Sequence, residues 1–410
     1  MRTYVTLIIF LSILLVIFTN YTSITYYSSL PSLNPSLNSL QTVPQINTES
    51  KKSSTLLTVS NPNLSTVTYT ISLTSCSSSP TLKHDSSLIG LIDGSLILRH
   101  SILTHSPTPP NFIAFIHTTA KDTPCHLELE RGGWECKVVD TPLKVSDIKT
   151  DNIRRNIEKN GCCGDKELIK LYAYTLTTSD VVIMLDLDVL LLRPLTSLIN
   201  SISISPEGTA SYTEDWGMVN PGKKPGAQGG FIVIKPSLRV FNELIDIVLN
   251  TPFNEKNLPG WNGSGIGPFW GAMTVQGLIP YYYQEVKGAA VEVLNRCMYN
   301  NMRDNPKVKN GEECRGPVKG VMECEDCREK KVEDIYSTHF TLCQKPWGCQ
   351  LNGKPWCTVL HDEWFYTREK MEVAVLGGDF TGKGMRGYCK KGGKEGYERV
   401  SDDVRSMINK

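Results

Sequence analysis

The sequence predicts an α/β protein in which helices flank one central, mostly parallel β-sheet. Apolar stretches of β type, such as 112–117, 181–185 and 230–234, alternate with stretches of helical periodicity. This alternation is typical of sheets whose parallel strands are joined through helices. A chain of 410 residues suggests one or two domains with a substantial core.

The first elements are expected to be two strands, over 112–117 and 134–139, followed by a helix. The helix is predicted from Lys166 to Thr177, with Asp165 as its N-cap. Its apolar face is formed at positions i, i+3, i+4 and i+8 by Leu168, Leu171, Tyr172 and Leu176. Lys170 lies near the edge of that face.

The next strand, Val181–Leu185, is followed by two carboxylates one residue apart, Asp186 and Asp188. Gly230–Ile234 predicts a further strand, and a helix is expected over 238–249. Beyond residue 352, an amphipathic stretch over 361–375 and a Gly- and Lys-rich tail indicate an appended helical element. We therefore expect one catalytic domain over 88–351 and a C-terminal extension over 352–410.

The carboxylate pair at the end of the strand indicates a cation site. Buried carboxylates are costly unless a cation or hydrogen-bond donors compensate them. Open α/β sheets bind their ligands at the carboxyl ends of the strands, where this pair lies. Oxygen-rich sites suit Mg²⁺ or Mn²⁺. The alternative is a surface turn in which Asp186 or Asp188 caps the next segment.

The N-terminal region predicts a membrane-targeting segment and a stem. Residues 1–19 carry a basic residue, Arg2, close to their start and continue as an apolar run. This pattern is typical of a signal anchor or a cleaved signal peptide. Arg2 favours a cytoplasmic N-terminus and hence a type II anchor. A buried helix of a cytosolic protein is the third alternative. Residues 20–87 are rich in Ser, Thr, Asn and Pro, which predicts an O-glycosylated or merely disordered stem.

Thirteen cysteines and two glycosylation sequons, at Asn63 and Asn262, favour an oxidising lumen. We expect disulfides, with at least one thiol left over because the count is odd. Cys162 and Cys163 are expected to bond to two separate partners. A zinc site is the alternative for the cysteines at 314, 324, 327 and 343, although a second C-x-x-C is missing. The net charge of +1 argues against a general nucleic-acid binder.

Four stretches carry further information, in chain order Lys170–Asp180, Val181–Leu195, Gln228–Ser237 and Ser337–Trp347. They resemble the family 8 glycosyltransferases, the group that includes glycogenin and plant glucuronosyltransferases. In the same order they look like the family's helix before the metal motif, its metal-motif strand, its Asn-Ser-Gly strand and its His-Phe-x-Gly-x-x-Lys-Pro-Trp segment. The sequences around Cys162–Gly164 and Cys324–Cys327 are similar to a branch found in microalgae.

The resemblance implies a GT-A fold, which is Rossmann-like and binds nucleotide sugars, a UDP-linked donor, Mn²⁺ or Mg²⁺, and retention at the anomeric carbon. Asp186, Asp188 and His339 match the family's metal ligands. Lys345 matches a residue on the donor diphosphate, and the backbone of Leu187 is expected near the nucleoside. For a lone histidine such as His339, a purely structural role is the alternative.

Further positions carry expected contacts to the donor sugar. Lys170 matches a basic position near the sugar, and Asp215 resembles an aspartate that contacts it, although a turn residue is the alternative. Gln228 and Gly230 belong to the stretch that resembles the family's Asn-Ser-Gly strand, and they are expected to contact the nucleotide sugar. Gln276 completes the candidate catalytic set of Lys170, Asp215 and Gln276. Trp347 is expected to be a packing residue.

Several positions depart from the family pattern. Val275-Gln276-Gly277 stands where Asp-Gln-Gly is frequent, so the aspartate is missing. Gln228 and Gly229 replace the usual Asn and Ser, and Leu342 occupies the usual glycine between His339 and Lys345.

Chemically, the predicted residues suit the departure of a nucleoside diphosphate. A divalent ion that bridges the phosphates acts as a Lewis acid on the developing charge, and Lys345 adds a fixed cation there. We therefore expect a Golgi or endomembrane enzyme, with a secreted form as the alternative location, that moves a hexose or hexuronic acid from a UDP-sugar to a glycan, protein or lipid acceptor. The alternatives are a catalytically impaired protein that binds nucleotide sugars or glycans, and a secreted disulfide-rich structural domain.

Overall fold

The computed structural model describes residues 65–76, 86–219, 223–254, 256, 259–305, 307, 325–390 and 396–408. Its strands are β1 (Val67–Leu73), β2 (Asn111–His117), β3 (Glu135–Val139), β4 (Val181–Leu185), β5 (Val189–Leu191), β6 (Ala210–Asp215), β7 (Gly226–Ile234), β8 (Phe253–Asn254), β9 (Gly260–Trp261), β10 (Val291–Leu294) and β11 (Ser337–His339). Its α-helices are α2 (Ser86–His105), α3 (Pro124–Arg131), α4 (Asp151–Asn156), α5 (Thr196–Ile204), α6 (Leu238–Asn250), α7 (Val275–Pro280), α8 (Thr358–Leu376), α9 (Gly384–Tyr388) and α10 (Asp402–Met407).

The central sheet has seven strands in the order β10-β6-β7-β4-β1-β2-β3. β4, β1, β2 and β3 run parallel to one another, as do β6 and β10, and β7 is antiparallel to both of its neighbours. The predicted α/β class with a mostly parallel sheet is therefore confirmed. The predicted strand 181–185 has the bounds of β4, and the other three predicted strands correspond to β2, β3 and β7.

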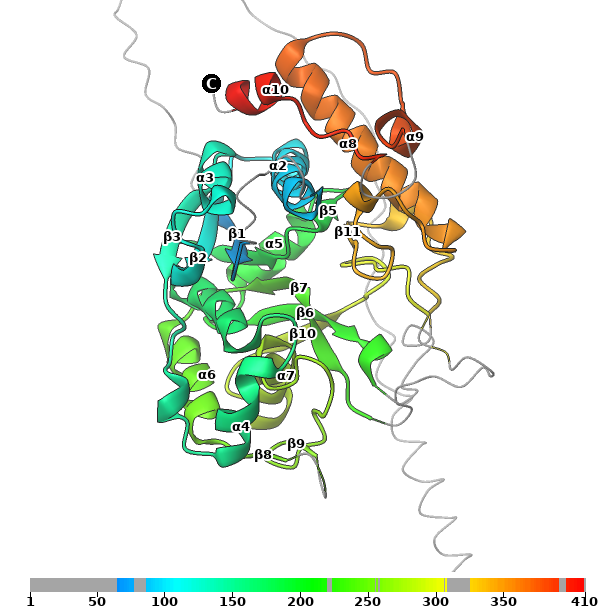
Figure 1. The fold of residues 1–410 in the computed structure, drawn as a ribbon. Helices are drawn as coiled ribbons and strands as arrows, with labels where there is room; N and C mark the ends of the chain where they lie inside the picture. The colour runs from blue at the N-terminus through cyan, green and yellow to red at the C-terminus, as the bar shows by residue number, and fades with distance from the viewer. Residues whose placement is uncertain are drawn as a thin grey trace, which may run out of the picture. The chain divides into compact units, whose positions relative to one another are not determined.

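Helices cover both faces of the sheet (Figure 1). On one face, α2, α3 and α5 pack over side chains such as Ile71, Ile183 and Phe231. On the other, α6 and α7 pack over side chains such as Met184 and Ile232. Successive residues of β4 therefore enter opposite cores, and the strand is apolar throughout because it is buried on both faces.

β1 corrects the predicted domain boundary at residue 88. This strand lies within the segment 20–87 that we predicted to be stem, yet it sits between β4 and β2 in the sheet. Its Thr68 and Thr70 are as buried as Tyr69 and Ile71. β-branched threonines fit a strand well, so the Ser/Thr content that indicated a stem conceals a central strand.

The C-terminal extension packs on the catalytic domain through a third hydrophobic core. α8 (orange in Figure 1) spans the predicted amphipathic stretch and lies against α2. Trp364 and Phe365 of α8 are buried there with Trp347. The carboxylate of Asp93 on α2 is buried and pairs with Arg405 of α10. Asp93 also accepts hydrogen bonds from the Tyr397 hydroxyl and the Val400 amide. The extension is thereby an integral part of the same compact unit.

The predicted helix 166–177 is a 3₁₀-helix, η4 (Gly164–Thr175), and Asp165 lies inside it instead of capping it. Cys163 occupies the N-cap and makes no side-chain capping bond. The predicted apolar face is confirmed, because Leu168 and Leu171 are fully buried and Tyr172 and Leu176 pack at the edge of the same core. The 3₁₀ winding changes which side chains share a face, so Lys170 is buried instead of lying at an edge.

Eight of the described cysteines form disulfides, as predicted for the chain in general. The pairs are Cys76–Cys125, Cys297–Cys327, Cys343–Cys357 and Cys349–Cys389. Because Cys327 and Cys343 are both bridged, neither is free for the alternative zinc site. Cys136, Cys162 and Cys163 are free thiols, so the prediction of two separate partners for Cys162 and Cys163 is wrong.

Some predictions fall on residues that are not described. These are the membrane segment 1–19, the stem up to residue 64, the sequon at Asn63, and Cys314 and Cys324. Within the described ranges, no helix combines the length and the apolar character needed to span a bilayer.

Candidate metal centre and active site

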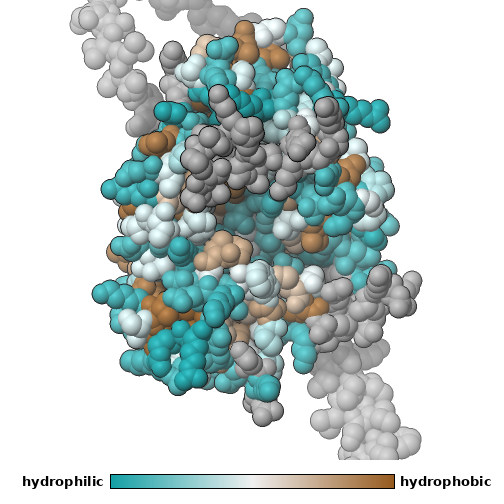
Figure 2. Space-filling view, viewed as in Figure 1, coloured by the Kyte–Doolittle hydropathy of each residue, from teal (hydrophilic) through white to brown (hydrophobic). Residues whose placement is uncertain are grey.

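A cavity of about 580 Å³ opens where β4, β6 and β7 meet β11. From the side shown in Figure 2, the surface is hollowed near its middle, and hydrophilic residues lie in the hollow. All the predicted site residues except Gly230 line the cavity. Those that do are Lys170, Asp186, Leu187, Asp188, Asp215, Gln228, Gln276, His339 and Lys345. The fold thus brings together residues that are up to 175 positions apart in the sequence, from Lys170 to Lys345.

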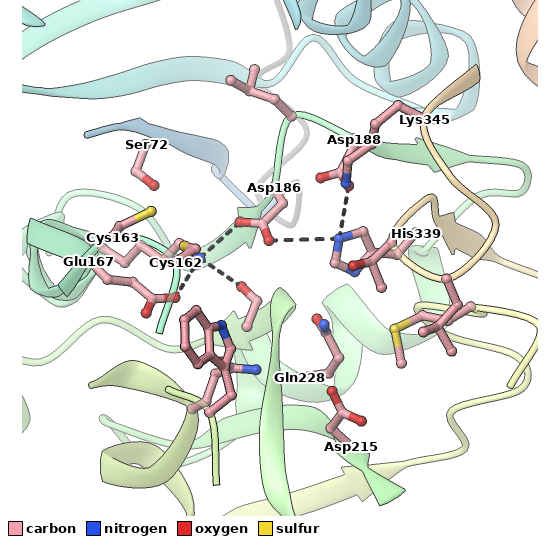
Figure 3. A pocket seen from close by; sticks show the side chains of 18 of the residues that line it. Ser72, Cys162, Cys163, Glu167, Asp186, Asp188, Asp215, Gln228, His339 and Lys345 are labelled. Atoms are coloured by element: carbon pink, nitrogen blue, oxygen red, sulfur yellow. Dashed lines mark hydrogen bonds and ion pairs between the residues drawn. The ribbon is translucent and has the colours of Figure 1, made fainter. Parts of the chain in front are cut away.

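The pairing of β5 with β11 assembles a group of two carboxylates and one imidazole. Val189 pairs with His339 in an antiparallel register, and the Phe340 amide donates to the Asp188 carbonyl at 2.9 Å. Nε2 of His339 thereby lies 3.2 Å from Oδ2 of Asp188 and 3.8 Å from Oδ2 of Asp186 (Figure 3). One ligand atom from each of the three residues lies within 4.8 Å of the others.

These three groups fit a small divalent cation. Neighbouring ligands of an octahedral ion at about 2.1 Å lie about 3 Å apart, and the separations of His339 from the two carboxylates are close to that. Two carboxylate oxygens and one imidazole nitrogen suit Mn²⁺ or Mg²⁺. Gly230 makes the arrangement sterically feasible, since a Cβ there would lie 2.6 Å from Nδ1 of His339. Nδ1 itself is buried and has no hydrogen-bond partner among the described residues.

Lys345 supplies positive charge beside Asp188. Its ammonium group contacts Oδ2 of Asp188 directly. Burial alone raises the pKa of Asp188, but His339 and Lys345 outweigh burial and hold this pKa well below its usual range. Asp188 is therefore ionised at every physiological pH. The Lys345 side chain is itself 42% exposed, so its ammonium is accessible to an anion that enters the cavity.

Lys170 is a buried cation on the opposite wall. Its Nζ lies 2.8 Å from Oδ1 of Asp186 and 3.3 Å from Oε1 of Glu167, and it donates to the Gly229 carbonyl at 3.2 Å. Burial lowers the pKa of Lys170, but Asp186 and Glu167 more than reverse this and raise it above its usual value. Lys170 is therefore held protonated, and it fixes the orientation of Asp186.

Glu167 is a site residue that sequence reasoning missed. Oε2 of Glu167 accepts a hydrogen bond from the Thr274 hydroxyl at 2.7 Å, while Oε1 faces Lys170. Its spacing of three residues from Lys170 could have indicated the contact, because residues at i and i+3 share a face of a helix. Glu167 ties η4 to the turn before α7 and so sets the position of Lys170.

Asp215 lies at the floor of the cavity in an unusual electrostatic environment. Burial raises the pKa of Asp215 most, the negative charge of Asp304 raises it further, and together they bring it to about 6. One of its oxygens, Oδ1, accepts a hydrogen bond from the Gly217 amide at 3.1 Å. A carboxyl group with this pKa changes protonation near neutral pH, and it can donate or accept a hydrogen bond to a hydroxyl group in the cavity.

Gln228 is held by a hydrogen-bond network next to Asp215. Its Oε1 accepts from the Gly230 amide at 2.6 Å and from Nδ2 of Asn300 at 3.1 Å. Asn300 also donates to the Thr213 hydroxyl on β6 at 3.2 Å. Because Oε1 is engaged, the amide group of Gln228 is the part left to donate into the cavity.

The positions that depart from the expected pattern have distinct surroundings. Val275 is fully buried in a hydrophobic core and does not line the cavity, whereas its neighbour Gln276 does. Leu342 is 39% exposed and forms part of the cavity rim. Trp347 is buried against Gly90 and Gly94 of α2, where an added Cβ would lie 1.9 and 2.9 Å from the indole. Trp347 therefore packs in a hydrophobic core, as predicted, and it also borders the cavity.

No protein-family model matches the sequence, and no curated protein is significantly similar to it. Similar solved structures include the bifunctional glycosyltransferase WbbM, with 12% identity and a TM-score of 0.40 over 71% of this chain and 50% of that one. Galactosyltransferase LgtC, in complex with donor and acceptor sugar analogues, is 11% identical with a TM-score of 0.41 over 73% of this chain and 94% of that one. Glycosyltransferase GlyE from Streptococcus pneumoniae is 12% identical with a TM-score of 0.39 over 83% of this chain and 66% of that one.

The chain spans half the length of WbbM and nearly all of LgtC.

Proposed function

We propose that this protein is a retaining GT-A glycosyltransferase of family 8 that transfers a hexose or hexuronic acid from a UDP-sugar to an acceptor, with Mn²⁺ or Mg²⁺. The observation that carries the proposal is the group formed by Asp186, Asp188 and His339, flanked by two lysines in one cavity. Carboxylates that hold a metal next to cationic side chains are typical of sites for diphosphates. The similarity to a microalgal branch stays a prediction.

In the proposed reaction, the donor diphosphate lies between the metal centre and Lys345. The metal, when bound, supplies Lewis acidity toward the phosphates. The ammonium of Lys345 leaves Asp188 and neutralises charge on the departing diphosphate, which is where a fixed cation lowers the barrier most. The Leu187 backbone, in the turn between the two carboxylates, is the contact proposed for the nucleoside.

The opposite wall is proposed to hold the sugar. Lys170 and Gln276 line this wall, and Asp215 and the amide of Gln228 lie at its floor. Hydrogen bonds from these groups to the sugar hydroxyls would fix the orientation of the anomeric carbon. No protein nucleophile is required if the leaving phosphate takes the proton of the acceptor, so we assign Asp215 a role in binding and not in covalent catalysis.

The position of Val275 does not favour the catalytically impaired alternative. Its side chain packs in the core, away from the cavity wall. The acceptor, which is a glycan, a protein or a lipid, stays open.

The decisive experiment is UDP-sugar hydrolysis by the full-length protein, across a panel of UDP-sugars, with and without Mn²⁺. We expect metal-dependent UDP release from one sugar, and its loss in Asp186→Asn and Asp188→Asn. Asp246→Asn, the same change at an exposed position of α6, is the matched control. UDP release that persists without metal, or in both site variants, would refute the proposal. UDP binding without turnover would favour the alternative of a binding protein.

We further propose that the protein resides in the Golgi or endomembrane lumen, anchored as a type II membrane protein through residues 1–19. The disulfides and the exposed side chain of Asn262 in its sequon support a lumenal location. A mobility shift after glycosidase treatment that disappears in Asn262→Gln, together with protease protection in intact vesicles, tests this. An accessible, unglycosylated protein would contradict it.

A further inference from the structure

Cys162 and Cys163 are free thiols in a protein whose other described cysteines, apart from Cys136, are bridged. Both line the main cavity together with Glu167, Lys170 and Asp186. Both also line a second cavity of about 560 Å³, which is lined in addition by residues such as His117 and Lys166. Figure 3 shows the two thiols next to Glu167, on the wall that faces Asp186. The pair is thus accessible to small solutes and adjacent to the proposed sugar site.

The loop that carries the thiols is held in one conformation. Gly161 and Gly164 flank the pair and both have positive φ, at 77° and 61°. A Cβ on Gly164 would lie 2.2 Å from the Glu158 carbonyl oxygen, so only glycine fits there. Within this loop the two free thiols belong to consecutive residues and line the same two cavities. The two sulfurs are therefore carried by the same short, conformationally fixed stretch of chain.

We propose that Cys162 and Cys163 form a reversible dithiol–disulfide pair that controls the sugar side of the cavity. Low-molecular-weight disulfides are the oxidant. One protein thiolate attacks such a disulfide, forms a mixed disulfide and releases one small thiol. The second protein sulfur then displaces the other small thiol. The protein loses two electrons and two protons, and the small disulfide is reduced to two thiols.

The geometry makes this bond reversible, unlike the four structural disulfides. Adjacent Cα atoms are about 3.8 Å apart across a trans peptide, below the usual range for disulfides of about 4.4 to 6.8 Å. The structural disulfides have Cα separations of 4.8 to 5.9 Å. Strained and exposed disulfides are the readily reduced ones.

Closure of the bond acts on the site through η4. This helix starts at Gly164, directly after the pair, and carries Glu167 and Lys170 into the cavity. Drawing the sulfurs into a bond turns the loop and displaces the start of the helix. The effect on activity rests on the proposed function, whereas the redox chemistry does not.

The first test detects the bond itself. Full-length protein is equilibrated with glutathione buffers of graded ratio, quenched with an alkylating reagent and digested with trypsin. Cleavage after Lys159 and Lys166 gives the peptide 160–166, which contains Cys162 and Cys163 and no other cysteine. We expect this peptide to switch between two alkylated thiols and a form lighter by two hydrogens, at ratios that leave Cys343–Cys357 closed. Cys136→Ser should behave like the wild type.

Two results would overturn the redox proposal. One is a peptide that stays reduced, or carries only glutathione adducts, at every ratio. The other is a bond that opens only together with the structural disulfides. Cys162→Ser and Cys163→Ser keep the size of the side chain and can give only the mixed adduct, which confirms that the lighter form is the internal bond.

The second test measures the binding of UDP with Mn²⁺ in the two redox states by calorimetry. We expect about fivefold weaker binding in the oxidised state, the lower end of typical coupling between sites. The double variant Cys162→Ser/Cys163→Ser, which has no thiol here to oxidise, should show no redox effect. Equal affinities for UDP in the two redox states would show that the bond does not control the site, although the reversible disulfide itself would stand. Absence of UDP binding in both states would refute the proposed function instead, since the peptide masses do not depend on it.

Discussion

A Cβ on Gly230 would lie 2.5 Å from Cε1 of His339, so the imidazole reaches the two aspartates only because residue 230 lacks a side chain. The backbone of β7 at Gly230 therefore lies close to the side chain of His339 at the end of β11. Strand packing thereby decides whether the third ligand can join the pair from the end of β4.

Gly230→Ala should therefore push His339 away from Asp186 and Asp188. We expect the affinity for Mn²⁺ to fall about 10- to 100-fold, the range found when groups that position metal ligands are altered. Calorimetric titration with Mn²⁺ measures it. Gly229→Ala is the matched control, because a Cβ there would lie 3.5 Å from its nearest neighbours, an ordinary contact. Equal Mn²⁺ affinities in the two variants would show that His339 is not a ligand.

Lys345→Ala should abolish a transition-state contact without unfolding the protein. Lys345 is 42% exposed, so its removal costs little packing. We expect kcat for UDP release to fall about 10²- to 10³-fold, as for other groups that stabilise developing negative charge. Lys354→Ala, which removes a partly exposed lysine bonded to the Leu342 carbonyl, should leave kcat unchanged. A Lys345→Ala enzyme that loses only donor affinity would contradict the role in the transition state.

Asp215 should make stability depend on pH in the metal-free protein. Its folded-state pKa of about 6 lies above the ordinary value of 3.8. The protonated carboxyl group of Asp215 therefore favours the folded state. This contribution to stability is fully present below the unfolded pKa and is lost as pH rises through 6. The loss amounts to about 3 kcal/mol for a shift of about two units.

Asp215→Asn removes this titration. Urea unfolding in EDTA between pH 4 and pH 7 measures it, and we expect the wild type to lose stability relative to the variant as pH rises. Asp246→Asn should follow the wild type. A pH-independent difference between wild type and Asp215→Asn would mean that burial does not raise this pKa.

Asp93→Ala should detach the C-terminal segment. It leaves the largely buried guanidinium of Arg405 with Glu128 as its one carboxylate partner among the described residues, and leaves the Tyr397 hydroxyl without its acceptor. Removing one partner of a buried ion pair costs about 3 to 5 kcal/mol. We expect that loss in urea unfolding, together with faster proteolysis near residue 400. Asp402→Ala, at an exposed position of α10, should cost far less. Equal losses would show that the buried pair does not hold this segment.

The sequence by itself determined the local elements around the site. The continuous apolar run of β4 gave its bounds because a strand buried on both faces needs no polar residues. The two carboxylates at its end indicated a cation site because buried carboxylates need compensation by a cation or by hydrogen-bond donors. His339 and Lys345, in contrast, were assigned through the resemblance of their segment to a known family, because composition does not distinguish a metal-binding histidine from a structural one.

The tertiary structure decided what depends on partners distant in sequence. β1 is a central strand because β2 and β4 pair with it on both sides, whereas its Ser/Thr content alone is equally typical of a stem. Glu167 joined the site through Thr274, and Cys162 and Cys163 remained unbridged next to the cavity. Strand pairing, side-chain contacts and disulfide partners are set by which segments meet in space, and local periodicity carries no record of that.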